Sequence, residues 1–353
     1  MKGAIDMDLL ETRLSLVDGA AGRLVIAGHD LEPLAERTGF EGVCGLLLGA
    51  GIDEGPSWAA RIGRGRQAAF ATLGRIGDAL ERPDGMDAIR AGLAHFETED
   101  PAAAIGAVAV LAAAWMRRRA GAAPVAPEPE RGHAADLLRM AVGERGAAAE
   151  RALDKYLVTV AEHGMNASTL AARVVVSTGS DLVSALVAAV GALKGPLHGG
   201  APGPVLDMLD AIGKPAAAVS WIEDELDAGR RIMGMGHRIY RVRDPRAAVL
   251  EQAAHELGGA GRIGRIDMAR AVERAAESAL RRRHPDRPLR ANVEFYTAIL
   301  LEAVGLPRAA FSPTFAVARS AGWCAHVAEQ RATGKLIRPD SRYIGPAPRP
   351  AQP

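Results

Sequence analysis

The chain has 353 residues, with 43 basic and 42 acidic side chains, a formal net charge of +1, and 48% apolar residues. Roughly two domains of about 150 residues each are expected at this length, and such a chain buries about three quarters of its unfolded surface without disulfides or metals. A charge sum near zero argues against a protein dedicated to nucleic acid or to membrane surfaces. We therefore expect neither nucleic acid nor a membrane as partner.

The cysteine content and the apolar runs bear on the compartment. Cys44 and Cys324 lie far apart and match no metal-ligand spacing, which favours a reduced protein over a disulfide scaffold. The first residues, MKGAIDMDLLETR, carry acids where a signal peptide has an apolar core, and the longest apolar run, Ala104 to Met116, is too short for a membrane span. These features predict a cytoplasmic protein.

The first predicted element is a β-hairpin. Apolar residues alternate before and after the turn-forming stretch Asp18 to Gly22, at Leu14 and Leu16 and again at Leu24 and Ile26. Alternation around a glycine-rich turn is typical of two antiparallel strands.

Beyond the hairpin the periodicity is helical. Apolar residues recur at three, four and seven positions, aromatic residues make up only 4%, and alanine fills much of the apolar fraction. The clearest repeats are Phe40, Val43 and Leu47; Leu153, Tyr156, Leu157 and Val160; and Ala247, Leu250, Ala254 and Leu257. The pattern predicts an almost all-α protein.

Glycine, proline and arginine mark the predicted breaks. AGAAPVAPEPERG, from Ala120 to Gly132, indicates an exposed loop, and GPAPRPAQP, from Gly345, indicates a tail. The runs Arg117 to Arg119 and Arg281 to Arg283 fall where helices are expected to end. There we favour cations that complement a helix C-terminus, with anion binding as the alternative.

Three segments are candidates for chemistry: GPLHGGA (Gly195 to Ala201), GMGHR (Gly234 to Arg238) and NVEFY (Asn292 to Tyr296). The glycines in the first two would let a bulky ligand approach the backbone, so we infer a cleft. For each histidine taken alone, a structural role in a core or turn is the alternative.

His198 has a specific expected property. A helix is predicted to end near Leu193 and another to begin near Pro202, which places His198 close to a helix N-terminus. The helix dipole there disfavours imidazolium, so the ring should be neutral near pH 7 and able to donate a hydrogen bond to a carbonyl oxygen.

Seven segments, taken in order, resemble those of the citrate synthase family, from about Glu11 to Pro346. They are VDGAAGRL, EHGMNAST (Glu162 to Thr169), GALKGPLHGGA, GMGHRIYRVRDPRA (Gly234 to Ala247), NVEFY, FAVARSAGW (Phe315 to Trp323) and KLIRP (Lys335 to Pro339). The resemblance implies a citrate synthase-like, two-domain helical fold with a small N-terminal hairpin. A large domain would hold residues 1–203 and 306–353, including the tail 345–353, and a small domain would hold residues 204–305. The cleft would lie between them.

The resemblance also implies a reaction. Family members join a carbon of a short acyl-CoA to the ketone of oxaloacetate and then hydrolyse the thioester, without a metal or a permanently bound cofactor. By position in the motifs, Glu294 would be the base that removes the α-proton, His198 would hydrogen-bond the thioester oxygen, and His237 would polarise and protonate the ketone. Acetyl-CoA giving citrate, the acyltransferase step of the tricarboxylic acid cycle, is the first expectation.

Binding residues follow from the same motifs. Arg246, Arg319 and Arg338 would hold the two carboxylates of oxaloacetate, with His163 as a further contact, because a guanidinium pairs with a carboxylate bidentately. The alternative for each arginine is a surface ion pair. In the family the equivalent of Arg338 reaches the partner's site, which implies a homodimer. Candidates for the CoA phosphates are Arg241 and Arg243.

The chain departs from the usual family pattern at the base, where Glu294 stands in place of Asp. The extra methylene moves the carboxylate by about 1.5 Å, and a misplacement of about 1 Å can cost about 100-fold in rate unless the backbone or rotamer compensates. Leu289 to Ala291, just before this segment, also differ from the more common sequence. Two alternatives therefore stay open: a 2-methylcitrate synthase or another acyl-CoA or 2-oxo acid, and a non-catalytic homologue that binds a dicarboxylate or CoA.

Overall fold

A computed structural model describes residues 10–199, 202–258, 260–286 and 289–346 of the chain. Near the N-terminus it has a three-stranded antiparallel sheet of β1 (Ser15–Asp18), β2 (Arg23–Ile26) and β3 (His29–Asp30), in that order. Ser15 pairs with Ile26 and Asp18 with Arg23, so the predicted hairpin is confirmed. The predicted tail from Gly345 lies mostly outside the described residues.

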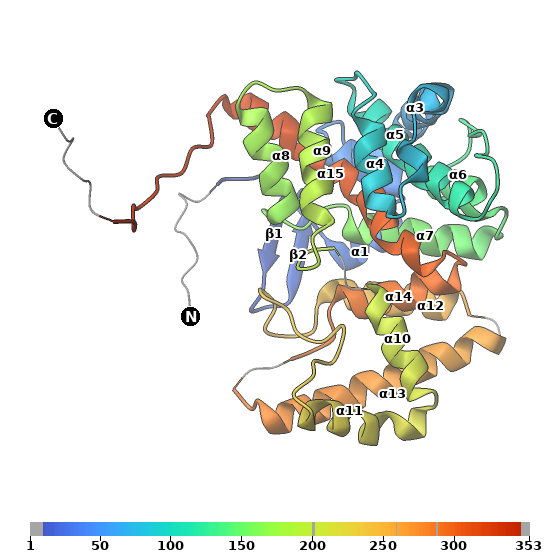
Figure 1. The fold of residues 1–353 in the computed structure, drawn as a ribbon, viewed down its shortest axis with the longest axis vertical. Coiled ribbons are helices and arrows are strands. Elements are labelled where there is room, and N and C mark those ends of the chain that lie inside the picture. Colours follow the sequence, from blue (N-terminus) through green and yellow to red (C-terminus); the bar gives the residue numbers. More distant parts are fainter. Residues whose placement is uncertain (1–9, 200–201, 259, 287–288, 347–353) are drawn as a thin grey trace.

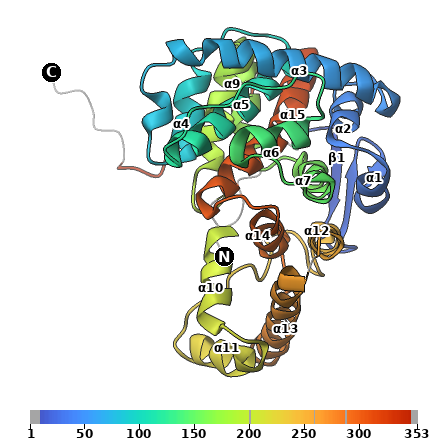
Figure 2. The ribbon, with the colours of Figure 1, turned by 90° about the vertical axis from the view of Figure 1, so that its right-hand side faces the viewer.

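The rest of the described chain is mainly helical, as predicted, and forms an upper and a lower group of helices in Figures 1 and 2. The upper group in Figure 1 consists of α1 (Leu31–Arg37), α2 (Phe40–Leu47), α3 (Gly55–Thr72), α4 (Gly85–Leu93), α5 (Pro101–Arg119), α6 (His133–Val142), α7 (Ala147–Val160), α8 (Ala167–Ser177), α9 (Leu182–Leu193) and α15 (Phe311–Thr333). The lower group consists of α10 (Pro202–Ile212), α11 (Ala218–Asp227), α12 (Pro245–Glu256), α13 (Ala260–Arg283) and α14 (Val293–Ala303).

The three helical repeats found in the sequence lie on α2, α7 and α12, with Leu257 as the residue directly after α12, and their apolar residues are buried. The stretch Ala120 to Gly132 contains no helix or strand, and the two arginine runs form the last turns of α5 and α13. The arginine at the end of α13, Arg283, also forms an ion pair with Asp227 at 2.6 Å. Cations at a helix C-terminus are thus confirmed at both places.

The long apolar run lies in the centre of the upper group. Pro101 starts α5, the Asp100 side chain accepts the N–H of Ala102, and the side chains from Ala104 to Met116 are buried. Neighbouring helices α3, α4, α6 and α15 pack around it. No helix in the described ranges is both long and apolar enough to cross a membrane.

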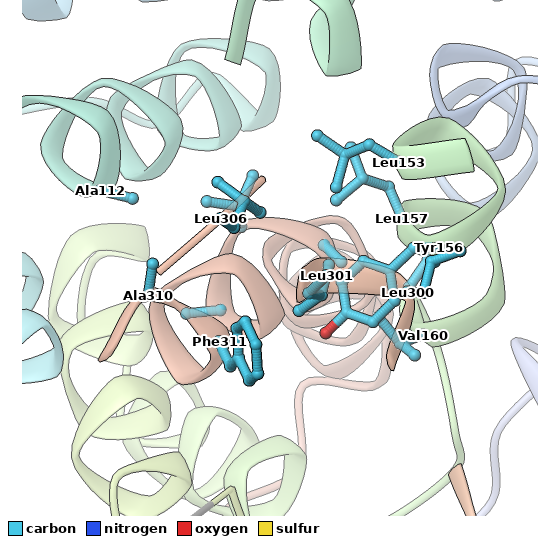
Figure 3. Close-up of a cluster of buried hydrophobic side chains, with 14 of the residues drawn as sticks. Ala112, Leu153, Tyr156, Leu157, Val160, Leu300, Leu301, Leu306, Ala310 and Phe311 are labelled. Carbon is cyan, nitrogen blue, oxygen red and sulfur yellow. The ribbon is translucent and has the colours of Figure 1, made fainter. Parts of the chain in front are cut away.

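An apolar cluster joins the two groups and fixes the helices that lead into the functional segments. Figure 3 shows Leu153, Tyr156, Leu157 and Val160 of α7 against Leu300 and Leu301 of α14 and Phe311 at the start of α15. Each large apolar side chain buried here contributes roughly 1.5–3 kcal/mol. The last turns of α7 and of α14 are therefore held against each other by the core, which fixes the helix that carries Glu294 in its first turn.

Helices within residues 204–305 differ in what they contact. α11 packs on α13 and α10 packs on α14, whereas α12 and α14 also pack on α7 of the upper group. Segment 204–305 therefore meets the upper group mainly through α12 and α14, and the proposed division into two domains stays a prediction.

Candidate active site

Two segments distant in sequence meet beside the start of α14. The N–H of Gly236 donates to the carbonyl of Arg290 at 2.7 Å, and the N–H of Asn292 donates to the carbonyl of Gly234 at 2.9 Å. Asn292 is also the N-cap of α14, because its Oδ1 accepts the N–H of Glu294 at 3.0 Å. This pairing holds the His237 segment against the turn that presents Glu294.

The glycines of the His237 segment serve this packing. A Cβ added at Gly234, where φ is +72°, would lie 2.9 Å from Cβ of Phe295. From the sequence, these glycines are expected to let a bulky ligand approach the backbone. The structure gives a second reason at Gly234, since the backbone of the His237 segment approaches the side chain of Phe295 in the NVEFY segment.

The tautomer of His237 follows from its backbone contacts. Nδ1 accepts two N–H groups, from Ile239 at 3.0 Å and from Tyr240 at 3.1 Å. Burial first, and the charge of Arg246 second, lower the pKa of His237 to about 4. The ring is therefore neutral near pH 7, with its proton on Nε2.

Arg246 supplies a second donor near the same point. Its Nη2 lies 3.3 Å from Nε2 of His237, and both atoms carry hydrogen in the state just described. Two donors that converge in this way fit an incoming oxygen atom that accepts from both. Asp244 holds the guanidinium in place through Nε at 3.0 Å and Nη2 at 2.8 Å.

The half-buried Glu294 carboxyl has a raised pKa of about 7. Burial is the largest cause, Arg246 opposes it by favouring the anion, and Asp244 adds to it by repulsion. A carboxyl with a pKa near 7 can both accept and release a proton at neutral pH, as a general base must.

His198 lies in the turn between α9 and α10, as predicted, and its Nε2 contacts Ser168. The Ser168 hydroxyl is 2.9 Å from Nε2, and the Ser168 backbone N–H points to the same atom at 3.3 Å. Because a backbone N–H only donates, this contact favours Nε2 as the acceptor and a proton on Nδ1. Burial, followed by Arg319, lowers the pKa of His198 to about 4, so the predicted neutral ring has a different main cause from the helix dipole.

His163 follows α7 and is buried beside His237. The two rings are 5.7 Å apart between centroids, and Nε2 of His163 lies 3.1 Å from the hydroxyl of Tyr240. The pKa of His163 is held well below its usual value by burial and then by Arg246 and Arg319. The adjacent Glu162 is fully buried and bonds to His326 at 3.0 Å.

Arg319, on α15, is a buried cation with unused hydrogen-bonding capacity. Its Nε donates to the carbonyl of Val160 at 2.7 Å, and its guanidinium lies over the ring of Phe315. Within the described part of the chain its Nη2 is buried without a hydrogen-bond partner. Burial is the main reason that its pKa falls to about 10. Such a group fits a ligand carboxylate.

The structure thus brings six of the predicted site residues into one region: His163, His198, His237, Arg246, Glu294 and Arg319. Three others lie elsewhere. Arg338 is exposed on the C-terminal segment that leaves the body of the molecule in Figure 1, and Arg241 is exposed. Arg243 forms ion pairs with Glu251 at 2.7 Å and Glu273 at 2.9 Å.

Sequence reasoning missed four supporting residues: Ser168, Asp244, Tyr240 and Glu162. Only Asp244 carries a clear local signal, since an Asp directly before a Pro is a typical helix start, and its side chain caps α12. The other three act through contacts that join segments at least 30 residues apart.

Two cavities adjoin the cluster. One of about 720 Å³ is lined by His237 and by several basic groups, namely Arg230, Arg231, Arg238, Arg283 and His284. The other, of about 10 Å³, lies against Glu294 and is lined mainly by Tyr156, Val160, Val293, Thr297 and Phe315. No group of three or more metal-ligating side chains occurs among the residues that the structure covers.

Comparisons with known proteins identify the family of the chain. A family model described as citrate synthase, C-terminal domain, matches residues 3–340. The chain is 51% identical to a putative citrate synthase 2 of Mycobacterium tuberculosis over 198 residues, or 56% of this chain and 52% of that protein. It thus spans about half the length of these first relatives. It is 35% identical to the citrate synthase of Haloferax volcanii (95% and 93% covered) and 34% identical to a 2-methylcitrate synthase of M. tuberculosis (98% and 90%).

Solved structures show the same fold. The citrate synthase of Thermotoga maritima superposes with a TM-score of 0.85 at 32% identity, covering 100% of this chain and 98% of that one. The citrate synthase of Thermoplasma acidophilum, in a ternary complex with carboxymethyl coenzyme A and oxaloacetate, superposes with a TM-score of 0.86 at 27% identity, covering 99% of this chain and 97% of that one. The fold is that of the citrate synthases. The chain belongs to the citrate synthase family.

Proposed function

We propose that this chain condenses a short acyl-CoA, first of all acetyl-CoA, with oxaloacetate to give citrate and free CoA. The observation that carries the proposal is one region that combines neutral His198 and His237, a carboxyl with a pKa of about 7 at Glu294, and the buried Arg319 guanidinium, whose Nη2 has no partner among the described residues. These are the groups needed to remove a proton, to stabilise an enol and to hold a carboxylate.

In this proposal Glu294 removes the α-proton of the thioester. The electrons move onto the thioester oxygen, which accepts a hydrogen bond from Nδ1 of His198, because Nε2 is occupied by Ser168. Low local polarity strengthens such a hydrogen bond at the developing charge. The resulting enol carbon then attacks the ketone of oxaloacetate.

Oxaloacetate would lie between His163, His237, Arg246 and Arg319. Its ketone oxygen would accept from Nε2 of His237 and Nη2 of Arg246, the two donors that converge at 3.3 Å. Its carboxylates would pair with the guanidiniums, of which Arg319 has the unused Nη2. As the new bond forms, His237 would give its Nε2 proton to the alkoxide, and the proton that Glu294 took from the thioester would then return the ring and the carboxylate to their starting states. Water would then hydrolyse the thioester.

The CoA phosphates would lie on basic groups beside the His237 segment. The basic lining of the 720 Å³ cavity and the exposed Arg241 support this placement. Arg243 has two carboxylate partners, so any phosphate there would compete with Glu251 and Glu273.

The small cavity against Glu294 supports a short acyl chain. At about 10 Å³ it has room for one group of roughly the size of a water molecule or a methyl. This agrees with acetyl-CoA as the substrate, and with propionyl-CoA as the alternative, a reaction for which the similarity to a 2-methylcitrate synthase is a second argument.

A homodimer is part of the proposal. Arg338 is exposed on a segment that leaves the body of its own chain, as expected for a residue that reaches a partner's site. An Arg338→Ala variant mixed with a His198→Ala variant tests this, because mixed dimers would regain one intact site. Absence of any recovery in verified mixed dimers would contradict the shared site. The cytoplasmic location and the closure of residues 204–305 over the cleft also stay predictions.

The central experiment follows release of free thiol from purified protein with oxaloacetate and a panel of acetyl-, propionyl- and butyryl-CoA. We expect release with acetyl-CoA, weaker release with propionyl-CoA and none with butyryl-CoA. Propionyl-CoA as the best substrate would favour the 2-methylcitrate reaction. Binding of CoA and oxaloacetate without thiol release from any member would favour the non-catalytic homologue.

A further inference from the structure

The N-terminal hairpin, which carries the VDGAAGRL motif, contacts both loops that present the substrate histidines. Neither its strands nor its turn supplies a group to the chemistry proposed above. In Figure 1 it extends from the upper helices toward the loops that precede α12. One end of β1 meets the loop of His163, and the turn after β1 meets the loop of His237.

The contact with the His163 loop is made by Ser15. Its hydroxyl donates to Oε1 of Glu162 at 2.9 Å and accepts the N–H of Gly164 at 3.0 Å. Glu162 and Gly164 are the residues on either side of His163. A Cβ built at Gly164 would lie 3.2 Å from Val17, so β1 packs closely on this loop.

The contact with the His237 loop is made by Gly19. Its carbonyl accepts the N–H of Arg241 at 2.8 Å. A Cβ added at Gly19 would collide with the carbonyl oxygen of Ile239 and lie 2.7 Å from its carbonyl carbon. Gly19 thus contacts the stretch from Ile239 to Arg241. The N–H groups of Ile239 and Tyr240 in this stretch fix the tautomer of His237.

The turn that makes this contact is internally braced. Oδ1 of Asp18 accepts the N–H groups of Ala20 at 3.0 Å and Ala21 at 2.9 Å. Gly22 closes the turn with φ at +67°, and a Cβ there would collide with Val242. These hydrogen bonds leave the turn few alternative conformations, so Gly19 and Gly22 hold the loop that they contact in one place.

We propose that the hairpin from Ser15 to Ile26 is a positioning element that holds the His163 and His237 loops at a fixed separation, and that Gly19 is a positioning residue for His237. The kinetic part of this inference rests on the proposed function. The proposal gives the hairpin motif a role. The backbone of Ile239 to Arg241 packs on Gly19, and the N–H of Ile239 in this stretch donates to Nδ1 of His237.

Gly19→Ala tests the seat of the His237 loop, with Gly28→Ala as the matched control. Gly28 lies in the next turn of the same sheet, where φ is +89° and an added Cβ has no atom of the described residues within 4 Å. The control therefore adds backbone strain to the hairpin without contacting the His237 loop. We expect Gly19→Ala to lower kcat/KM for oxaloacetate by about 100-fold, the cost of a displacement of about 1 Å, and Gly28→Ala to change it less than twofold.

Two further readouts separate positioning from stability and from the proposed function. Nitrogen chemical shifts of labelled histidines report the His237 tautomer without any turnover, and we expect the Nδ1-acceptor signature to weaken in Gly19→Ala alone. Oxaloacetate binding by calorimetry should weaken in parallel. An inactive wild-type protein would remove the proposed function yet leave these two tests in force.

Ser15 tests the other contact independently. Ser15→Ala removes the hydroxyl, and we expect the KM for oxaloacetate to rise about 10-fold, the effect of losing about one hydrogen bond. Ser15→Thr retains a hydroxyl, so its KM for oxaloacetate should stay close to that of the wild-type protein. The proposal is overturned if Gly19→Ala keeps wild-type kinetics and histidine shifts, or if Gly28→Ala impairs both as strongly.

Discussion

Asp244 holds the guanidinium of Arg246 at two points, at 3.0 Å from Nε and 2.8 Å from Nη2, and the same carboxylate accepts the N–H of Val293 at 3.1 Å. One acid thus links a proposed substrate-binding arginine to the first residue of α14, next to Glu294. Its negative charge also raises the pKa of Glu294. Asp244 therefore affects both the position of one group and the protonation of another.

The first prediction concerns Asp244→Asn, which keeps an oxygen for the N-cap and removes the charge. Loss of the repulsion should lower the pKa of Glu294, and the unpaired Arg246 should lower it further. We expect the acidic limb of the rate profile to move to lower pH and the maximal rate to fall. A limb that stays in place would show that Asp244 has no electrostatic effect on the base.

The second prediction is the acidic limb itself. Glu294 has a pKa of about 7, and only its anion can accept the α-proton, so below pH 7 the rate should fall about tenfold for each pH unit. His198 and His237, with pKa values of about 4, stay neutral throughout this range. The measurement is kcat/KM for the acyl-CoA from pH 5 to 9.

Substitutions at Glu294 sharpen that measurement. Glu294→Gln should abolish thiol release while leaving oxaloacetate binding nearly unchanged. Glu294→Asp should shorten the side chain and lower the rate if the cleft is built around Glu, whereas a gain in rate would show that Glu is the poorer base here. Residual pH-dependent activity in Glu294→Gln would exclude Glu294 as the base.

The third prediction compares two buried arginines. Arg319→Met removes a guanidinium whose Nη2 lacks a partner in the covered part of the chain, so KM for oxaloacetate should rise at least about 30-fold, or roughly 2 kcal/mol, with little loss of stability. The control is Arg66→Met, which removes the fully buried ion-pair partner of Asp136 and, among the described residues, leaves that carboxylate paired only with Arg139, at 2.7 Å. It should lower the melting temperature and leave KM unchanged. Equal effects on KM would contradict a binding role for Arg319.

The fourth prediction concerns stability. Burial, and then the nearby charge of Glu41, raise the pKa of Asp154 from 3.8 to about 7. The folded protein therefore retains a proton that the unfolded chain releases, and this stabilisation, complete below about pH 4, is lost as the pH rises to about 7. Asp154→Asn should reduce the drop in melting temperature between pH 5 and pH 8. The exposed Asp53→Asn is the control and should not change that drop.

Much of the fold was predictable because it depends on local patterns. The hairpin followed from alternation around Asp18 to Gly22, and α2, α7 and α12 followed from their apolar repeats. The six clustered site residues were named from motifs, but their protonation states depend on neighbours far away in sequence. The proton on Nε2 of His237 follows from two backbone contacts, and the neutral state of His198 follows mainly from burial.

Other features had no sequence signal. Arg243 looks like a phosphate ligand in an Arg-x-Arg pair, yet its partners Glu251 and Glu273 come from α12 and α13. Nothing local shows that two carboxylates would converge on it. Ser168 similarly acquires its contact with His198 only when α8 and the turn after α9 come together.

The backbone pairing of Gly234 to Gly236 with Arg290 to Asn292 has a consequence for how the molecule opens. The amides of Gly236 and Asn292 are donors in this pairing, although they lie 56 residues apart in the chain. Both amide hydrogens can exchange with solvent deuterium only when the pairing breaks, so they should exchange at one common rate. Any motion that preserves this pairing carries His237 and the start of α14 together.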